Sequence, residues 1–489
     1  MEGEAGPVEW SRFRMVALVA GPALGALGWT WCHPSVGGGT LSPAGAAVVG
    51  MLIWMAIWWA TQAVDLAITG LLPIVIFPLA GIAPAEQVLP PYANDVIFLF
   101  AGGCVIAFAI ERHGLGERFT SLVLSHVGHA PGRVIAGFMV ATALVSAWVS
   151  NTAATAMMLP LAMAAIAWFA GAQGARGGAR SGSDSAPMQQ FQQAVLLAVA
   201  YGASIGGAMT LLGSPPNPIA AEWIRESGSA MSFARWASFG VPLGLAMTAC
   251  SLLAFRVLFP CRGLLAPSRG AGAFADRAPM TRAAWIALAV FACAAVAWVA
   301  APLVAPWTGV RLRDGQIAVA AAIVLLAVPA ARGDSRAIVP WSDIGRLPLG
   351  VFLLFGGGLA LADAMQRTGV SDAIAASLTG LGALPEPLLI LLVVLAMVFA
   401  SEIASNTALA ATAVPIVGAM AAGLGVPAER LVIAAALGAS YAFMLPVGTP
   451  PNAIVYATGR VPVRSMLRAG LVLNIIAAAI VTAVCLLIV

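Results

Sequence analysis

The sequence carries very little charge. Charged residues make up 9% of the 489 positions, whereas soluble globular proteins carry about 25%. Lysine is absent, so all 24 basic residues are arginines, and they are scattered between apolar runs. A nucleic-acid-binding protein would need a contiguous basic face. The charge deficit therefore excludes a water-soluble enzyme, and the scatter argues against a nucleic-acid partner.

Cysteine and catalytic motifs are also scarce. The six cysteines lie in or beside apolar segments without CxxC spacing, which predicts neither a disulfide framework nor a metal site. The motifs HExxH, GxxxxGK[ST] and a GxGxxG within a βαβ unit are absent, so ATP-driven pumping is not expected. One GxSxG match at 202–206 leaves an intramembrane serine hydrolase as an alternative. We favour small-residue packing there, because the four histidines fall in loops or at span ends, and we expect neither an enzyme nor an organic cofactor.

Long apolar runs fill most of the remaining sequence. Hydrophobic residues make up 61% of the chain, and at roughly 20 residues per crossing the length allows about a dozen passes. We therefore predict an all-α polytopic membrane protein, with the first apolar run retained as a span. The predicted spans are 15–31, 43–62, 66–82, 94–111, 189–212, 239–259, 283–302, 315–331, 349–366, 429–447 and 469–489.

Two further apolar runs, 134–170 and 386–424, are too long for single spans. As one helix, the first would measure about 55 Å, against a hydrocarbon core of roughly 30 Å. Ser150-Asn151-Thr152 lies near its middle, and Ser405 lies within the second run. Both runs are predicted to be re-entrant hairpins that fold at these polar tips.

The sequence contains an internal repeat. Ser150-Asn151-Thr152 recurs 255 positions later as Ser405-Asn406-Thr407, and FAGGCVIAFAIERHG from 100 aligns with FGGGLALADAMQRTG from 355 at the same offset. GSPPN at 213–217 recurs as GTPPN at 448–452, 235 positions later. The shorter offset is explained by the polar stretch 171–190, which we predict to be a loop insertion. The chain is therefore read as a duplicated transporter module with two broken helices.

The arginines predict how the repeats are oriented. With a cytoplasmic N-terminus, eighteen arginines lie inside and six outside, in agreement with the positive-inside rule. Five predicted crossings separate the two hairpins, so the hairpins enter from opposite sides and the repeats are inverted. The first repeat is predicted to consist of segments 1–111 and 112–237, and the second of segments 238–366 and 367–489.

The hairpin tips have the chemistry of ion binding. Ser and Asn cap helices well, and the arm that starts after Asn151 points free N–H groups and its positive dipole end at the tip, which suits an anion. Carbonyls at the end of the preceding arm, with Ser146, are hard oxygen ligands for Na⁺. The proline pairs free further carbonyls at membrane depth. Ion-coupled anion transport is the prediction, and helix caps and kinks with tight packing are the alternative.

Glu402 lies inside the second hairpin, where a carboxylate usually has a function. It could carry a proton, tune the second cation site, or anchor the structure beneath the tip. We favour the anchor.

The paired motifs resemble those of a known family of transporters. The paired SNT tips, the paired G(S/T)PPN loops and the FxGG and GGG segments resemble those of the divalent anion/sodium symporter (DASS) family, which imports di- and tricarboxylates or sulfate. The resemblance covers nearly the whole chain. The family segment WWxTEAxP reads WWATQAVD at 58–65, with Gln62 for Glu and Asp65 for Pro.

The resemblance implies a homodimer of scaffold and transport domains with an elevator-type alternating-access mechanism. It implies a first sodium site at Ser146, Ser150, Asn151 and Gly213, and a second at Ser401, Ser405, Asn406 and Gly448. It places the substrate at Asn151, Thr152, Asn406, Thr407, Thr449 and Pro450.

From this resemblance we expect a sodium-coupled importer of C4-dicarboxylates such as succinate, malate or fumarate, in the lipid of a bacterial-type inner membrane. A sulfate or citrate symporter, a dicarboxylate exchanger and a proton-coupled carrier stay open as alternatives.

Overall fold

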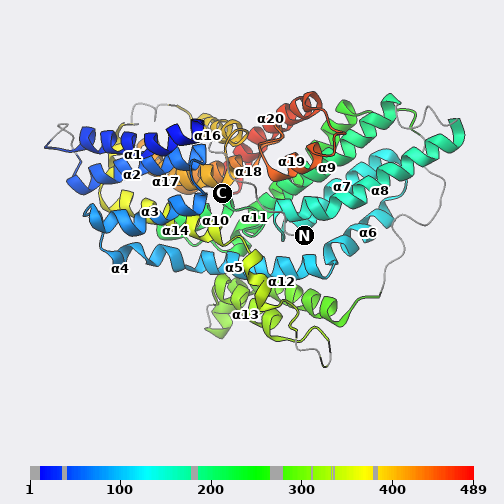
Figure 1. Cartoon of the computed structure of the whole chain (residues 1–489), viewed down its shortest axis with the longest axis horizontal. Coiled ribbons are helices and arrows are strands. Elements are labelled where there is room, and N and C mark those ends of the chain that lie inside the picture. The colour runs from blue at the N-terminus through cyan, green and yellow to red at the C-terminus, as the bar shows by residue number, and fades with distance from the viewer. Residues whose placement is uncertain are drawn as a thin grey trace. The chain divides into compact units, whose positions relative to one another are not determined.

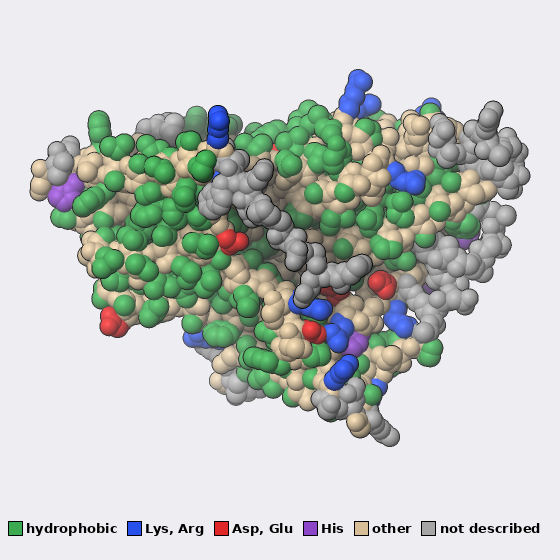
Figure 2. Space-filling model, viewed as in Figure 1, with side chains coloured by type: hydrophobic (Ala, Val, Ile, Leu, Met, Phe, Trp, Pro, Cys, Tyr) green, Lys and Arg blue, Asp and Glu red, His purple; other side chains and the backbone are tan. Residues whose placement is uncertain are grey.

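The computed structural model describes residues 12–35, 41–177, 185–264, 279–309, 312–331, 333, 336–377 and 384–489. Within these ranges the regular structure is helical, apart from one isolated bridge between Pro329 and Ala337 (Figure 1). Ten of the described helices are long and apolar enough to cross a membrane, and four shorter helices are also apolar. Hydrophobic side chains spread over most of the visible face (Figure 2). The prediction of an all-α polytopic membrane protein is confirmed.

The helices of the first half agree with the predicted spans to within a few residues. They are α1 (Arg12–Cys32), α2 (Pro43–Thr61), α3 (Leu66–Leu79), α4 (Ala85–Val88), α5 (Asp95–Arg112), α6 (Leu115–Val127), α7 (Pro131–Ser146), α8 (Asn151–Gly177), α9 (Ala186–Met209) and α10 (Pro216–Glu226). A 3₁₀ turn, η1 (Pro90–Ala93), precedes α5.

The second half repeats this order. It contains α11 (Phe233–Leu258), α12 (Arg282–Thr308), α13 (Asp314–Ala327), η2 (Trp341–Arg346), α14 (Leu349–Arg367), α15 (Val370–Ser377), α16 (Glu386–Ser401), α17 (Asn406–Leu424), α18 (Ala428–Ser440), α19 (Pro450–Tyr456) and α20 (Val463–Leu487). The short amphipathic helices α6 and α15 were not predicted, because they are too short and too polar to register as spans.

The chain forms two compact units. The first consists of 1–94, 348–385 and 407–432, and the second of 95–347, 386–406 and 433–489. In the second unit α9 is the central helix, and α7, α8, α11 and α19 all pack against it. Every residue of α9 from Ala194 to Met209 is buried.

Equivalent helices of the two repeats make equivalent contacts, one in each unit. In the second unit α5 packs against α13, and a Cβ on Gly102 would lie 2.5 Å from the Ala318 carbonyl oxygen. In the first unit α14 packs against α3, and a Cβ on Gly357 would lie 2.6 Å from the Gly70 Cα. Gly102 and Gly357 are 255 positions apart, so the duplication seen in the sequence is also present in the packing.

The predicted breaks at the hairpin tips are confirmed. Helix α7 ends at Ser146 and α8 begins at Asn151, and in the second repeat α16 ends at Ser401 and α17 begins at Asn406. The predicted loop at 171–190 is wrong at both ends, since α8 continues to Gly177 and α9 begins at Ala186. Alanine, glutamine and arginine in 171–177 are good helix formers and allow the helix to continue. Residues 178–184 lie outside the described ranges.

The predicted breaks at the proline pairs are confirmed as well. Helix α9 ends at Met209 and α10 starts at Pro216, while α18 ends at Ser440 and α19 starts at Pro450. Proline is favoured at the first turn of a helix because the N–H it lacks would have no intrahelical partner there. The proline pairs therefore start new helices after short non-helical connections.

Candidate functional site

The first hairpin tip gathers polar atoms around Asn151. The Ser146 hydroxyl, fully buried at the end of α7, donates to the Ala203 carbonyl at 2.8 Å and lies 2.7 Å from the Asn151 side chain. A hydroxyl has one proton, so it cannot donate to both groups. The Asn151 amide fits the cluster when its nitrogen faces inward, because its two N–H groups then lie within reach of three acceptors: the Ser146 Oγ, the Ala203 carbonyl (3.0 Å) and the Gly213 carbonyl (3.2 Å). In the opposite orientation, the amide oxygen faces these same three atoms, so that every polar atom of the cluster is an oxygen.

The second tip repeats this arrangement. The Ser401 hydroxyl donates to the Ala439 carbonyl at 2.7 Å and lies 2.6 Å from the Asn406 side-chain oxygen. Ser401 and Asn406 are each 255 positions after their first-repeat counterparts. The structure therefore joins a serine, an asparagine and a carbonyl of the following helix in both repeats, as the sequence spacing predicted for the side chains.

Two glycines bring the backbone of the second unit close to the first tip. A Cβ on Gly207 would lie 2.9 Å from the Asn151 Cγ and closer still to both amide atoms of that side chain. A Cβ on Gly213 would lie 2.8 Å from the Ser146 carbonyl oxygen and 2.7 Å from the Gly207 carbonyl oxygen. Real Cβ atoms essentially never lie this close to another atom, so a side chain at either glycine would force its neighbours to shift. The cluster therefore depends on the absence of side chains at both positions.

The asparagines that follow the proline pairs hold the broken helices in shape. The Asn217 amide donates to the carbonyls of Gly207 (2.8 Å) and Thr210 (2.7 Å). The Asn452 amide makes the matching bonds to Ala442 (3.1 Å) and Leu445 (3.0 Å). The sequence analysis missed this role, because it attributed the PPN motif to its prolines alone. Both side-chain oxygens are buried, and neither has a hydrogen-bond partner within the described ranges.

The remaining predicted site residues have different surroundings. Ser150 caps α8 by accepting from the Ala153 N–H at 3.3 Å, and Thr449 caps α19 by accepting from the Asn452 N–H at 3.4 Å. Thr152 and Pro450 are exposed. Ser405 is half-buried, Gly448 is buried, and Thr407 belongs to the first compact unit.

Glu402 is a buried acceptor with three donors. Its carboxylate accepts from the backbone N–H groups of Met444 and Leu445, both at 2.8 Å, and from the Asn474 amide at 2.7 Å. A Cβ on Gly448 would lie 2.9 Å from Glu402 Oε2. The residue thus ties the tip of the second hairpin to the connection that precedes α19. These contacts support the anchor interpretation, and the equivalent position in the first repeat is Ala147.

Other carboxylates have structural partners. Arg225 of α10 bonds to Asp95 (2.8 Å) and Asp314 (3.1 Å), and Asp314 also accepts from the Phe233 N–H at 2.7 Å. The sequence analysis did not predict this partly buried ion cluster. Asp65 caps α3 through the Ala67 N–H at 2.8 Å, which explains the departure from proline at that position.

The donor set at the tips suits a hard cation. Within the described ranges, no group of three or more His, Cys, Asp or Glu side chains could hold a metal ion. The tips instead offer neutral hydroxyl, amide and backbone carbonyl oxygens, which unwound helices use to coordinate Na⁺.

The GxSxG match at 202–206 serves packing, since a Cβ on Gly202 would lie 2.7 Å from the Met139 carbonyl oxygen and Ser204 is fully buried.

Two intertwined helical repeats, each with a broken helix and a Ser–Asn tip, define a membrane secondary transporter. The chain belongs to the family described as sodium:sulfate symporter transmembrane region, whose profile matches residues 23–488. It is therefore a transporter and not an enzyme.

Comparisons with known proteins find a relative by sequence and two solved structures with a similar fold. The sodium-dependent dicarboxylate transporter SdcS of Staphylococcus aureus, in strains RF122 and NCTC 8325, is 33% identical over 480 residues, covering 96% of this chain and 90% of the relative. The YdaH transporter of Alcanivorax borkumensis shares the fold with a TM-score of 0.55 and 17% identity, over 97% of this chain and 96% of that one. MtrF of Neisseria gonorrhoeae has a TM-score of 0.52 and 13% identity, over 94% and 97% of the two chains.

Proposed function

We propose that this protein is a sodium-coupled importer of C4-dicarboxylates such as succinate, malate or fumarate. The observation that carries the proposal is the pair of repeat-related clusters, Ser146 with Asn151 and Ser401 with Asn406. The relative named a sodium-dependent dicarboxylate transporter supports both the ion and the substrate class.

The first sodium site consists of Ser146, Ser150, Asn151 and Gly213 in this proposal. In one orientation the Asn151 amide nitrogen faces three oxygens and donates its two protons to them, and a half-turn about χ2 replaces the nitrogen with an oxygen. That second orientation is unfavourable by itself because oxygen then faces oxygen. A cation makes it favourable, so sodium binding is linked to a rotation of a single amide.

The second sodium site consists of Ser401, Ser405, Asn406 and Gly448. Glu402 lies beside it and holds the backbone at Met444 and Leu445. A carboxylate at this place adds a fixed negative charge near the second cation, which the first site lacks. We therefore expect the two sites to differ in sodium affinity.

The substrate carboxylates bind at Asn151, Thr152, Asn406, Thr407, Thr449 and Pro450 in this proposal. Helices α8 and α17 both begin at a tip asparagine, and the positive ends of their dipoles favour an anion. Bound sodium adds further positive charge. This explains how an anion with two charges could be bound without an arginine in the tips.

Alternating access is proposed to follow the elevator-type mechanism, with 112–237 and 367–489 moving against the scaffold segments 1–111 and 238–366 in a homodimer. The arginine distribution supports an inner-membrane protein with its N-terminus in the cytoplasm. Sulfate or citrate symport, dicarboxylate exchange and proton coupling are the competing functions.

The test is uptake of labelled succinate into proteoliposomes with an inward sodium gradient, compared with potassium alone. We expect sodium-dependent accumulation that malate competes away. Stronger competition by sulfate or citrate would reassign the substrate. Uptake that needs internal succinate and no sodium would establish an exchanger and refute sodium coupling. Vesicles without protein are the control for leakage, and the Asn406→Ala protein is expected to give uptake no greater than theirs.

A further inference from the structure

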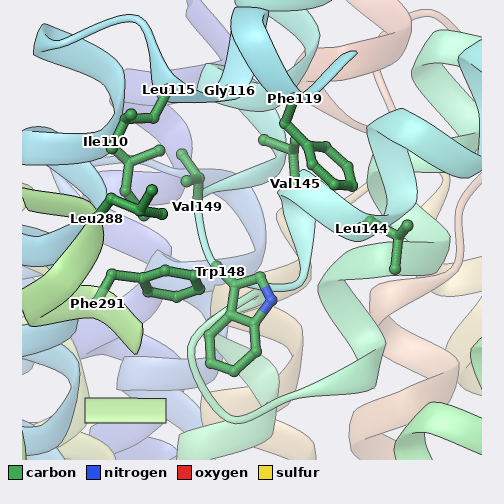
Figure 3. Close-up of a pocket in the computed structure, with 10 residues that line it drawn as sticks. All are labelled: Ile110, Leu115, Gly116, Phe119, Leu144, Val145, Trp148, Val149, Leu288 and Phe291. Atoms are coloured by element: carbon green, nitrogen blue, oxygen red, sulfur yellow. The ribbon is translucent and has the colours of Figure 1, made fainter. Parts of the chain in front are cut away.

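An apolar pocket lies beside the first hairpin tip in the second unit. Its volume is about 230 Å³, and it is bounded by α5, α6, α7 and α12 (Figure 3). The residues that line it include Ile110, Leu115, Phe119, Leu288 and Phe291. Trp148 and Val149 line it from the connection between α7 and α8, directly before Ser150 in the chain.

The pocket suits an apolar occupant better than water. The side chains that line it carry no charge and no hydroxyl or amide group apart from the Trp148 indole N–H. An apolar lining offers water no hydrogen-bond partners, and an apolar cavity of about 150 Å³ already binds a molecule the size of benzene. Left empty, it would lose the dispersion contacts of its lining. In a membrane-spanning protein, the abundant apolar molecule is the acyl chain of a lipid.

The pocket is open towards the surface at the level of an interfacial helix. Phe119 and Leu144, which line it, are 39% and 40% exposed. Helix α6 carries Glu117 and Arg118 near its start, with exposed Phe119 and Leu122 on its apolar side. A short amphipathic helix of this kind lies at the boundary between headgroups and acyl chains. A lipid tail can therefore enter the pocket while its headgroup stays at the interface.

Two arginines, one on α6 and one on α12, are candidates for binding the headgroup. Arg118 precedes the pocket residue Phe119, and its guanidinium donates to the Pro279 carbonyl at 3.5 Å. This bond places it beside the start of α12, where Arg282 is the first residue. Arg282 lies six residues before Leu288, about 9 Å along the helix. Guanidinium groups bind phosphate through charge-assisted hydrogen bonds.

We propose that this pocket is a binding site for an anionic phospholipid, with one acyl chain between α5, α6, α7 and α12 and the phosphate at Arg118 and Arg282. The chain would contact Trp148 and Val149 and so would restrain the connection that leads to Ser150. The site is separate from the proposed sodium and substrate residues, and the inference does not depend on which anion is transported.

The experiment uses phosphatidylglycerol that carries a photoactivatable diazirine in one acyl chain. The full-length protein is reconstituted with a trace of this probe, irradiated, digested and analysed by mass spectrometry for labelled residues. Phosphatidylcholine and a free fatty acid with the same diazirine chain are the comparison probes. Leu288→Trp fills the pocket, and Leu303→Trp is the matched control on α12, because Leu303 is 68% exposed and lies outside the pocket.

We expect labelling concentrated on residues 144–149 and 288–291, displaced by unlabelled phosphatidylglycerol, lost in Leu288→Trp and kept in Leu303→Trp. Arg118→Gln and Arg282→Gln should each reduce the preference for phosphatidylglycerol over phosphatidylcholine about fivefold, from the attraction of one basic residue to anionic lipid. Labelling spread evenly over the exposed apolar helices, or unchanged in Leu288→Trp, would overturn the site. Equal labelling by the free fatty acid would overturn the headgroup assignment.

Discussion

A single methyl group at Gly207 should weaken the proposed first sodium site without replacing any of its ligands. A Cβ at this position would lie 2.9 Å from the Asn151 Cγ and closer still to both amide atoms, whereas ordinary contacts begin at about 3.4 Å. The Asn151 amide must therefore move by more than half an ångström in Gly207→Ala. Metal–ligand distances tolerate about 0.2 Å, so the variant should lose the asparagine ligand or bind sodium with distorted geometry.

The expected size follows from the behaviour of residues that orient metal ligands, whose mutation costs roughly 10- to 100-fold in affinity. Half-maximal succinate uptake by Gly207→Ala should need 10- to 100-fold more sodium, with uptake recovered as sodium is raised. The assay is initial uptake into proteoliposomes across a sodium titration at constant ionic strength.

Gly171→Ala on α8 is the matched control, because a Cβ there meets nothing within 4 Å. It should titrate like the natural protein. A well-folded Gly207→Ala protein with an unchanged sodium titration would refute the placement of sodium beside Asn151. Thermal unfolding in detergent establishes whether the variant is folded, so that a packing defect is distinguished from a binding defect.

The remaining predictions concern the tips, the anchor and the buried ion cluster. Asn151→Ala and Asn406→Ala should each abolish uptake while leaving the unfolding temperature nearly unchanged, and normal uptake by either would exclude the two-tip site. Glu402→Gln keeps the shape of the side chain but replaces one acceptor oxygen by an NH₂ group that faces backbone N–H groups. Half-maximal succinate uptake should therefore need more sodium, as measured by the same titration. Arg225→Met leaves Asp95 and Asp314 without their cation and should lower the free energy of unfolding by about 3–5 kcal/mol, measured by denaturation in detergent; a stability equal to the natural protein would contradict the pairing. Ser204→Ala should preserve uptake, since this hydroxyl only fills space.

Part of this site could be predicted from local sequence, and part depends on contacts between distant segments. Ser146, Asn151, Ser401 and Asn406 were identified because each lies at a break in an apolar run and each recurs at one offset. Local composition decides such breaks, so no knowledge of distant contacts was needed. Asn217 was assigned no role of its own, although it lies in a motif already identified. Its partners, the carbonyls of Gly207 and Thr210, are backbone groups that leave no mark in the sequence.

The sequence by itself determined the membrane class, the helical spans, the duplication and the polar tips, because hydrophobic length and helix-breaking residues act within one or two turns. Only the tertiary structure decided which groups meet at those tips. Ser146 reaches a carbonyl 57 residues away at Ala203, and Arg225 reaches Asp95 across 130 residues. In the sequence, Gly207 cannot be distinguished from other small residues of its helix, because the need for glycine comes from its contact with Asn151. Contacts of this kind depend on how helices cross, and crossing is fixed by the close packing of many side chains at once.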